Sequence, residues 1–188
     1  AGCRTLVSVP NNSPVISSST GNHTIPKSTP FALTCTASDA DGDVMTYNWD
    51  QFDNQVSTQS PLATNTGGPN FRCFSSTLSP TWYFPTISSI STNTNDPWQV
   101  LPSVARTMNF RLTVRDNHSG NGCTASATST ITFDGTAGPF VVSSPSTTGI
   151  SYPALSTQTI TWSVAGTNVA PVNCSNVDIL LSTDGGLT

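Results

Sequence analysis

The densest group of carboxylates in the chain lies in the short segment Asp-Ala-Asp-Gly-Asp, which places Asp39, Asp41 and Asp43 at alternate positions. Alternate carboxylates around a glycine turn can direct several hard oxygen atoms toward one centre, and such oxygens are the ligands that Ca²⁺ requires. Without a cation, three carboxylates this close repel one another by about 1 kcal/mol per pair, even in a largely aqueous setting. The segment therefore predicts a calcium site. The alternative is that the three side chains only form Asx turns.

Two further ligands are expected from Asp116 and Asn117, which follow a strongly alternating segment. If the segments before and after the Asp cluster are neighbouring strands, the cluster is the turn at one pole of the fold. A strand antiparallel to the second of them, ending at Asp116, would finish at that same pole. Asp116 and Asn117 would then help to complete the shell of about six to eight oxygens that Ca²⁺ takes.

The match to an EF-hand loop is only partial, because no Glu closes the segment and no helices are expected to flank it. There is an alternative to a bound cation, since Arg106 or Arg115 could neutralise the Asp cluster by ion pairing. Exposed pairs of this kind contribute only about 0–1 kcal/mol. Arg115 should point away from a core-facing Val114, so we expect it to be solvated.

The fold class follows from composition and periodicity. The chain has no Glu and a single Lys, which disfavours long helices, whereas its Thr, Val, Ile and aromatic residues favour strands. The clearest period-two pattern places Met108, Phe110, Leu112 and Val114 on one face. Regular strands with short turns predict an all-β fold, a two-layer sandwich.

We expect two domains. Residues 1–135 would form the calcium-binding sandwich, with a long, ordered insertion at residues 54–103 that is rich in proline and bulky aromatic residues. Residues 136–188, which follow a Gly- and Pro-containing boundary, would form an incomplete second β domain with strands around Trp162 and Ile179. Such a domain leaves an open sheet edge that another segment or chain must cover.

The cysteines are scattered and contain no C-x-x-C pair, and only two histidines accompany them, so no zinc site is expected. Their scatter fits an oxidising compartment with one or two disulfides. The candidates for pairing are Cys3, Cys35, Cys73 and Cys123, with Cys73 suited to pin the insertion and Cys174 the expected orphan. The pairing itself stays open.

Several function classes are disfavoured. A net charge of −4 without a Lys/Arg cluster argues against nucleic-acid binding. No apolar run approaches the ~18 residues needed to span a membrane. His23 and His118 stand alone in polar segments, and no G-x-S-x-G motif occurs, so the chain is not expected to be an enzyme.

Exposed aromatic residues of the insertion suggest a binding role. Trp82, Tyr83 and Trp98 could stack on sugar rings or hold a polymer if they formed a flat strip. The alternative, which requires no ligand, is that they pack the insertion against the sandwich.

Three segments are informative together: TPFALTCTASDADGDVMTYNWDQFD, then LPSVARTMNFRLTVRDN, then AGPFVVSSP with ITWSVAGTNVAPVNCSNVDILLSTDGGLT. In this order and spacing, from about Ile25 onward, they resemble the region downstream of the catalytic domain in secreted bacterial reprolysin-like zinc metallopeptidases. The resemblance implies an immunoglobulin-like accessory sandwich, similar to polycystic-kidney-disease or cadherin-like domains, and then a fibronectin-like domain at residues 136–188. The peptidase motif H-E-x-x-H-x-x-G-x-x-H is not in this sequence.

The expected function is therefore that of a non-catalytic accessory or spacer module of a secreted or cell-surface metallopeptidase-like protein, stabilised by calcium. Its partners would be the remainder of the parent protein and a polymer or protein substrate. Two alternatives remain. One is a subunit of an extracellular fibre or surface assembly, completed by strand donation from neighbouring copies. The other is a carbohydrate-binding module.

Overall fold

Two long strands, β7 (Arg106–Arg115) and β8 (Thr124–Asp134), form the centre of the main sheet in the computed structural model, which describes residues 10–57 and 59–184. The sheet has the order β2-β8-β7-β5, where β2 is His23–Pro26 and β5 is Thr46–Gln51. β2 runs parallel to β8, and the other neighbours are antiparallel. Every second side chain of β7 is buried, which confirms the period-two pattern of the sequence.

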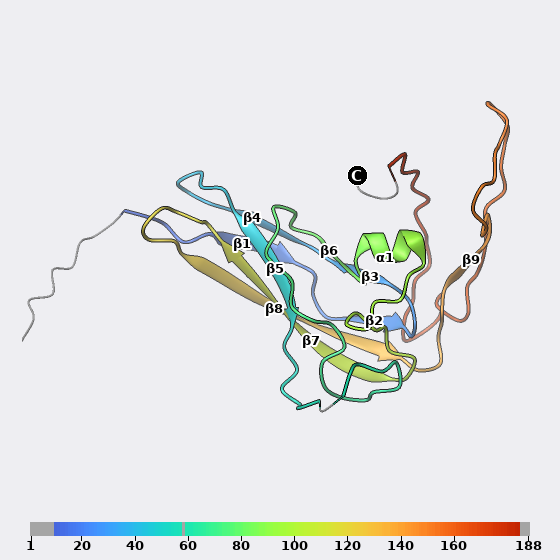
Figure 1. Ribbon diagram of the computed structural model, residues 1–188, viewed down its shortest axis with the longest axis horizontal. Helices are drawn as coiled ribbons and strands as arrows, with labels where there is room; N and C mark the ends of the chain where they lie inside the picture. Colours follow the sequence, from blue (N-terminus) through green and yellow to red (C-terminus); the bar gives the residue numbers. More distant parts are fainter. Residues whose placement is uncertain (1–9, 58, 185–188) are drawn as a thin grey trace, which may run out of the picture.

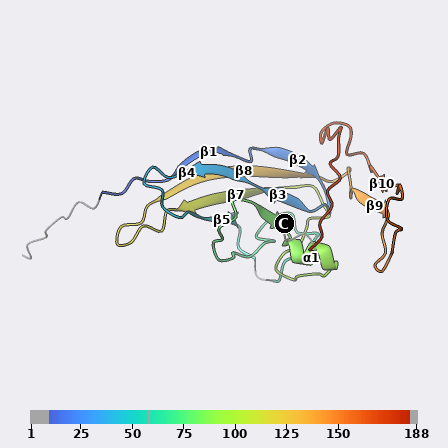
Figure 2. The ribbon, with the colours of Figure 1, turned by 90° about the horizontal axis from the view of Figure 1, so that it is seen from above.

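A second layer covers one face of this sheet (Figures 1 and 2). It contains β1 (Val15–Ser19) paired with β4 (Cys35–Ser38), and β3 (Phe31–Leu33) paired with β6 (Trp82–Phe84). The two layers enclose one apolar core. The prediction of an all-β sandwich is confirmed.

A cluster of phenylalanine rings fills the core between the layers. The centroids of contacting rings lie 4.9 to 6.2 Å apart, and most pairs meet edge to face, an arrangement that adds to the energy of burial. The cluster consists of Phe31, Phe71, Phe84, Phe110 and Phe133. Phe71 and Phe84 come from the segment that the sequence indicated as an insertion, so that segment supplies part of the core.

The rest of residues 54–103 is held to the sandwich by secondary structure and by polar contacts. It contains β6 and the short helix α1 (Ile87–Thr92). The Gln51 side-chain oxygen accepts hydrogen bonds from the backbone N–H groups of Asn70 and Phe71, at 2.7 and 3.0 Å. These contacts, not a disulfide at Cys73, fix the path of the segment.

Arg106 is the buried centre of this attachment. Its guanidinium donates to the backbone oxygens of Asn65 and Gly68 and to the side-chain oxygen of Asn70, at 2.7 to 3.0 Å. It also lies 3.9 Å from Asp53, and the side chains of this ion pair are 1% and 4% exposed. Arg106 begins β7, at the opposite end of the strand from Arg115, so it takes no part in neutralising the Asp cluster.

The cysteines do not pair as expected. Cys35, Cys73, Cys123 and Cys174 are all free thiols, and Cys3 lies outside the described residues. Cys35 belongs to the sandwich core, where burial raises the pKa of its thiol, whereas Cys73 and Cys174 are exposed. A core-facing thiol in the second layer is therefore used as a small apolar side chain.

After the sandwich, the chain forms a two-stranded sheet of β9 (Val141–Ser144) and β10 (Thr161–Ser163), near Trp162 as the sequence predicted. The strand expected around Ile179 is not formed, and residues 173–181 have no regular secondary structure. Their apolar side chains are exposed, Leu181 by 93%. Among the described residues, no helix is long and apolar enough to cross a membrane.

Asp134 fixes the turn that leaves β8. One of its carboxylate oxygens accepts hydrogen bonds from the backbone N–H and hydroxyl of Thr136, both at 2.6 Å, and from the N–H of Ala137 at 2.7 Å. These hydrogen bonds lower the pKa of Asp134, and the bond from the Thr136 hydroxyl has the largest effect. The carboxylate therefore stabilises the fold above its unfolded pKa of about 4, and this contribution is lost as the pH falls through the lower folded value.

We accordingly expect Asp134→Asn to melt below the wild type at pH 7, with the gap closing as the pH is lowered to about 2. Thermal melting followed by circular dichroism at both pH values measures the two gaps. A gap of constant size would show that the charge of Asp134 does not contribute to stability.

Candidate metal centre

The predicted Asp cluster lies at one pole of the sandwich, in the turn between β4 and β5. Thr46, the first residue of β5, pairs with Arg115, the last residue of β7. The residues that precede β5 and those that follow β7 therefore meet at the same end. Figure 1 shows the β4–β5 turn, the β7–β8 loop and the first described residues gathered there, away from β9. The topological argument that placed Asp116 at this pole is correct.

The three carboxylates of the turn converge. Each of Asp39, Asp41 and Asp43 offers an oxygen atom, and these atoms all lie within 4.8 Å of one another. One Asp39 oxygen accepts the backbone N–H groups of Asp41 and Asp43, at 2.9 and 3.2 Å, which closes the turn. Gly42 makes this turn with a φ of 79°, a conformation that glycine adopts without strain.

Residues 11 and 12 also reach the pole, which sequence reasoning missed. Asn12 donates its backbone N–H to one oxygen of Asp41 at 2.6 Å, and its side-chain N–H to the other oxygen at 2.9 Å. The backbone bond and then the side-chain bond from Asn12 lower the pKa of Asp41. Asp41 is thereby kept ionised, in the form that a cation would bind.

Asp116 is 1% exposed and sits beside this cluster. Its carboxylate accepts the side-chain N–H of Asn11 at 2.9 Å, the backbone N–H of His118 at 3.2 Å, and that of Cys123 at 2.8 and 3.0 Å. Burial raises the pKa of Asp116, but these hydrogen bonds together outweigh it and the net shift is downward. A buried carboxylate is thus held in its charged form.

His118 is part of the same group of side chains, although the sequence indicated an isolated surface histidine. Its Nδ1 lies 2.8 Å from a carboxylate oxygen of Asp43. This hydrogen bond raises the pKa of His118, and the nearby charges of Asp43, Asp116 and Asp41 act in the same direction. The pole therefore holds four carboxylates and one basic side chain.

Asn117 has a different role from the one expected. Its side-chain N–H groups donate to the backbone oxygen of Val44 at 2.8 Å and to the hydroxyl of Thr46 at 3.1 Å. The residue has a φ of 54°, so it also turns the chain out of β7. Asn117 ties the β7–β8 loop to the start of β5, and its amide is used for that contact.

Two buried oxygens at this pole lack any hydrogen-bond partner: the second carboxylate oxygen of Asp39 and the side-chain oxygen of Asn11. The amide nitrogen of Asn11 is committed to Asp116 and to the backbone oxygen of Asn121, at 2.9 and 2.7 Å, which fixes the orientation of its oxygen. A buried acceptor without a donor is costly, and native proteins rarely keep one. These orphaned oxygens and the surrounding carboxylates fit a hard, oxygen-preferring cation such as Ca²⁺.

No protein-family model and no curated protein matches this chain. The resemblance to the accessory region of metallopeptidases therefore remains an expectation from three sequence segments. Among the residues that the structure describes, Asp39, Asp41 and Asp43 are the one group of three or more His, Cys or acidic side chains close enough to share a metal ion.

The three aromatic residues considered as a possible ligand-binding strip do not share a face. Trp82 packs on Phe74, with ring centroids 5.2 Å apart, and its ring nitrogen is buried without a partner. Tyr83, the next residue of β6, points to the opposite side of the strand and is 42% exposed. Trp98 is 47% exposed and lies in a separate loop. Trp98 lines a hollow together with residues of the 57–72 segment.

Proposed function

We propose that this chain is a non-catalytic accessory or spacer module of a secreted, metallopeptidase-like protein, and that calcium bound at the pole of its sandwich holds its loops in place. Asp39, Asp41 and Asp43 would supply carboxylate oxygens, and Asn11 an amide oxygen. Asp116, whose carboxylate already accepts N–H groups of three residues, would add negative charge beside the site. Carboxylate-rich sites of extracellular modules bind Ca²⁺ with dissociation constants of about 10⁻⁴ to 10⁻³ M. A site of this strength suits a protein that works outside the cell.

The observation that carries the proposal is the pair of buried, unpartnered oxygens on Asp39 and Asn11 beside the convergent carboxylates. Asx turns alone, the alternative considered for the sequence, would account for the Asp39 oxygen that accepts two backbone N–H groups. Asx turns do not account for the second Asp39 oxygen, which is buried and has no hydrogen-bond partner. A divalent cation would offset the repulsion among the carboxylates and would satisfy both orphaned acceptors.

Such a site would connect three separate parts of the chain. Asn11 comes from the start of the described chain, the three clustered carboxylates from the β4–β5 turn, and Asp116 from the loop after β7. Because each part contributes charge or oxygen to one small region, bound calcium would stabilise the pole as a unit. A rigid pole is what a spacer needs to hold adjoining parts of a protein in a fixed orientation.

The non-catalytic part of the proposal rests on the composition of the chain and on its resemblance to the accessory region. The sequence holds no Glu and only two His, so the zinc-peptidase motif is not in it. His118, the histidine at the pole, is already engaged with Asp43. The peptidase activity of the parent would therefore reside in another domain.

The test is a calcium titration of thermal stability. Protein freed of metal with a chelator is melted in increasing CaCl₂, with MgCl₂ as the comparison. If the dissociation constant is about 10⁻⁴ to 10⁻³ M, 10 mM Ca²⁺ should stabilise the fold by roughly 1.4 to 2.7 kcal/mol. This corresponds to a rise in melting temperature of about 3 to 10 °C.

The same concentration of Mg²⁺ should have a smaller effect, because Mg²⁺ demands stricter geometry and retains its water ligands. A shift below about one degree at 10 mM Ca²⁺ would contradict the proposal, and an equal response to both ions would point to general charge screening rather than to a built site.

A further inference from the structure

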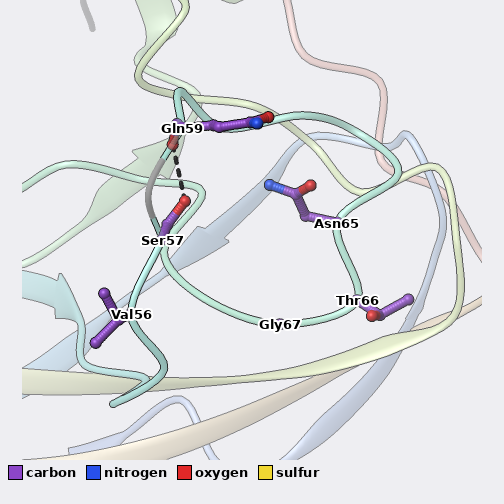
Figure 3. A pocket seen from close by; sticks show the side chains of 6 residues that line it. All are labelled: Val56, Ser57, Gln59, Asn65, Thr66 and Gly67. Atoms are coloured by element: carbon purple, nitrogen blue, oxygen red, sulfur yellow. Dashed lines mark hydrogen bonds between the residues drawn. The ribbon is translucent and has the colours of Figure 1, made fainter.

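Two adjoining hollows lie in the segment between β5 and β7, and they share Ser57 and Gln59. We name them the aromatic hollow and the polar hollow. The aromatic hollow, about 210 Å³, is further lined by Pro61, Pro69, Phe71, Arg72 and Trp98. The polar hollow, about 300 Å³, is further lined by Val56, Asn65, Thr66 and Gly67 (Figure 3). Together they offer an apolar platform next to a group of neutral hydrogen-bonding side chains.

The Trp98 side chain is exposed, while its backbone is held by hydrogen bonds. Its backbone N–H donates to a carboxylate oxygen of Asp96 at 2.8 Å, and its backbone oxygen accepts the N–H of Arg72 at 2.9 Å. The residues beside them, Phe71 and Gln99, form a β-bridge. The backbone is thus held from both sides while the indole remains 47% exposed. A large aromatic face that is fixed in advance loses little conformational freedom when a ligand stacks on it.

The loop that lines the polar hollow is also anchored by backbone hydrogen bonds. The backbone of Asn65 donates to Leu62 at 3.0 Å and accepts from the buried Arg106 at 3.0 Å. Figure 3 shows the Asn65 amide pointing toward the interior of the ring formed by this loop, with the hydroxyl of Ser57 bonded to the backbone of Gln59 at 2.8 Å. Amide and hydroxyl groups placed on a loop that the core anchors can form directional hydrogen bonds to a ligand.

The charge of the two hollows indicates the class of ligand. None of the side chains that line the polar hollow is ionisable. The aromatic hollow contains one charged group, Arg72, which interacts electrostatically with Asp96. The polar hollow is therefore uncharged, and the aromatic hollow carries the single positive charge of Arg72, which is not the cluster of like charges that selects a polyanion. A sugar ring matches this chemistry, since its C–H face is apolar while its hydroxyls both donate and accept hydrogen bonds.

We propose that the two hollows bind a neutral polysaccharide chain, with one sugar ring stacked on Trp98 and the adjacent sugar hydrogen-bonded by Asn65 and Gln59. This is a function beyond that of the calcium-stabilised spacer. The hollows follow β5, whereas the calcium cluster precedes it, so the two sites lie beyond opposite ends of the same strand. The loss of one site is therefore experimentally separable from the loss of the other.

The experiment is native affinity electrophoresis of the full chain through gels that contain one soluble neutral polysaccharide: hydroxyethylcellulose, glucomannan, laminarin, xylan or dextran. We expect at least one of them to retard the wild type. Trp98→Ala should weaken that binding by about tenfold or more, as expected for the loss of a stacking face. Asn65→Ala should weaken it through the polar hollow, with the loop still held by its backbone bonds. Tyr83→Ala removes an exposed aromatic ring outside the hollows and should bind as the wild type does.

Several outcomes would overturn the proposal: no retardation by any of the five polymers, or retardation that Trp98→Ala and Asn65→Ala leave unchanged. A deca-proline peptide serves as the competing probe. Trp98-dependent binding of that peptide, without binding to a polysaccharide, would assign the platform to proline-rich protein segments instead. Melting curves of each variant, with and without Ca²⁺, verify the fold and report on the calcium site independently.

Discussion

Replacing Arg106 with methionine is expected to lower the free energy of unfolding by about 3 to 5 kcal/mol, the usual consequence of removing one partner of a buried ion pair. Asp53 would be left 4% exposed and without its counter-charge. The backbone oxygen of Asn65 and the side-chain oxygen of Asn70 would lose their donor as well, and the backbone oxygen of Gly68 would keep only the Gln51 side-chain N–H. Because the Arg106 guanidinium also binds the backbone of the segment after β5, we expect this segment to loosen before the sandwich unfolds.

Urea unfolding measures the effect, and the chain supplies two controls. Arg111→Met changes an exposed arginine on the same strand, whose guanidinium lies 5.0 Å from the Phe52 ring, and should cost less than about 1 kcal/mol. The double variant Asp53→Asn/Arg106→Met removes both charges, and it should recover part of the loss because no uncompensated charge stays buried. A loss below about 1 kcal/mol for Arg106→Met alone would mean that the ion pair does not anchor the segment.

The sandwich could be predicted from the sequence because its long strands obey a local rule. The buried and exposed residues of β7 alternate without a break, and β8 alternates beside it. The role of Phe71 could not be predicted in this way. It lies in a segment without periodicity and enters the core because the buried side chains of Gln51 and Arg106 bind the backbone around it, at Phe71 and at Gly68. Long-range polar attachment leaves no periodic pattern in a sequence.

The metal centre, too, combines residues that local sequence patterns predict with residues that only the tertiary structure reveals. Alternate spacing indicated Asp39, Asp41 and Asp43, and strand topology correctly placed Asp116 beside them. Asn11 could not be predicted, since it precedes the cluster by many residues and reaches it only through the path of β1. Asn117 was expected as a ligand because it adjoins Asp116. Its left-handed backbone conformation instead directs its amide to the start of β5.

The sequence also does not reveal which aromatic residues of the insertion pack against the protein and which remain available to a ligand. Trp82 and Tyr83 are adjacent in a strand, so they point to opposite sides, and a single strip is excluded once β6 is recognised as a strand. Recognising it requires the pairing with β3, which lies about fifty residues earlier in the chain. Trp98 owes its position to the Asp96 turn and to Arg72, contacts that composition does not reveal.

Replacing Asp39 with asparagine is expected to abolish the calcium-dependent rise in melting temperature while leaving the melting temperature of the metal-free protein equal to or above that of the wild type. Asparagine retains an oxygen that can accept the N–H groups of Asp41 and Asp43, so the turn should persist. It removes the charged oxygen that is buried without a partner, together with its repulsion from the two neighbouring carboxylates. The substitution therefore separates the stability of the turn from the binding of a cation.

The matched control is Asp178→Asn, which removes the same charge from an exposed position outside the pole and should leave the full calcium response. Melting curves of both variants with a chelator and with 10 mM Ca²⁺ give the four temperatures that matter. An undiminished calcium response in Asp39→Asn would place the cation elsewhere. A large loss of stability in the metal-free variant would instead mean that the Asp39 carboxylate serves the turn itself. The two results distinguish a side chain retained to hold an ion from one retained to shape a loop, and the unpartnered oxygen of Asp39 favours the first.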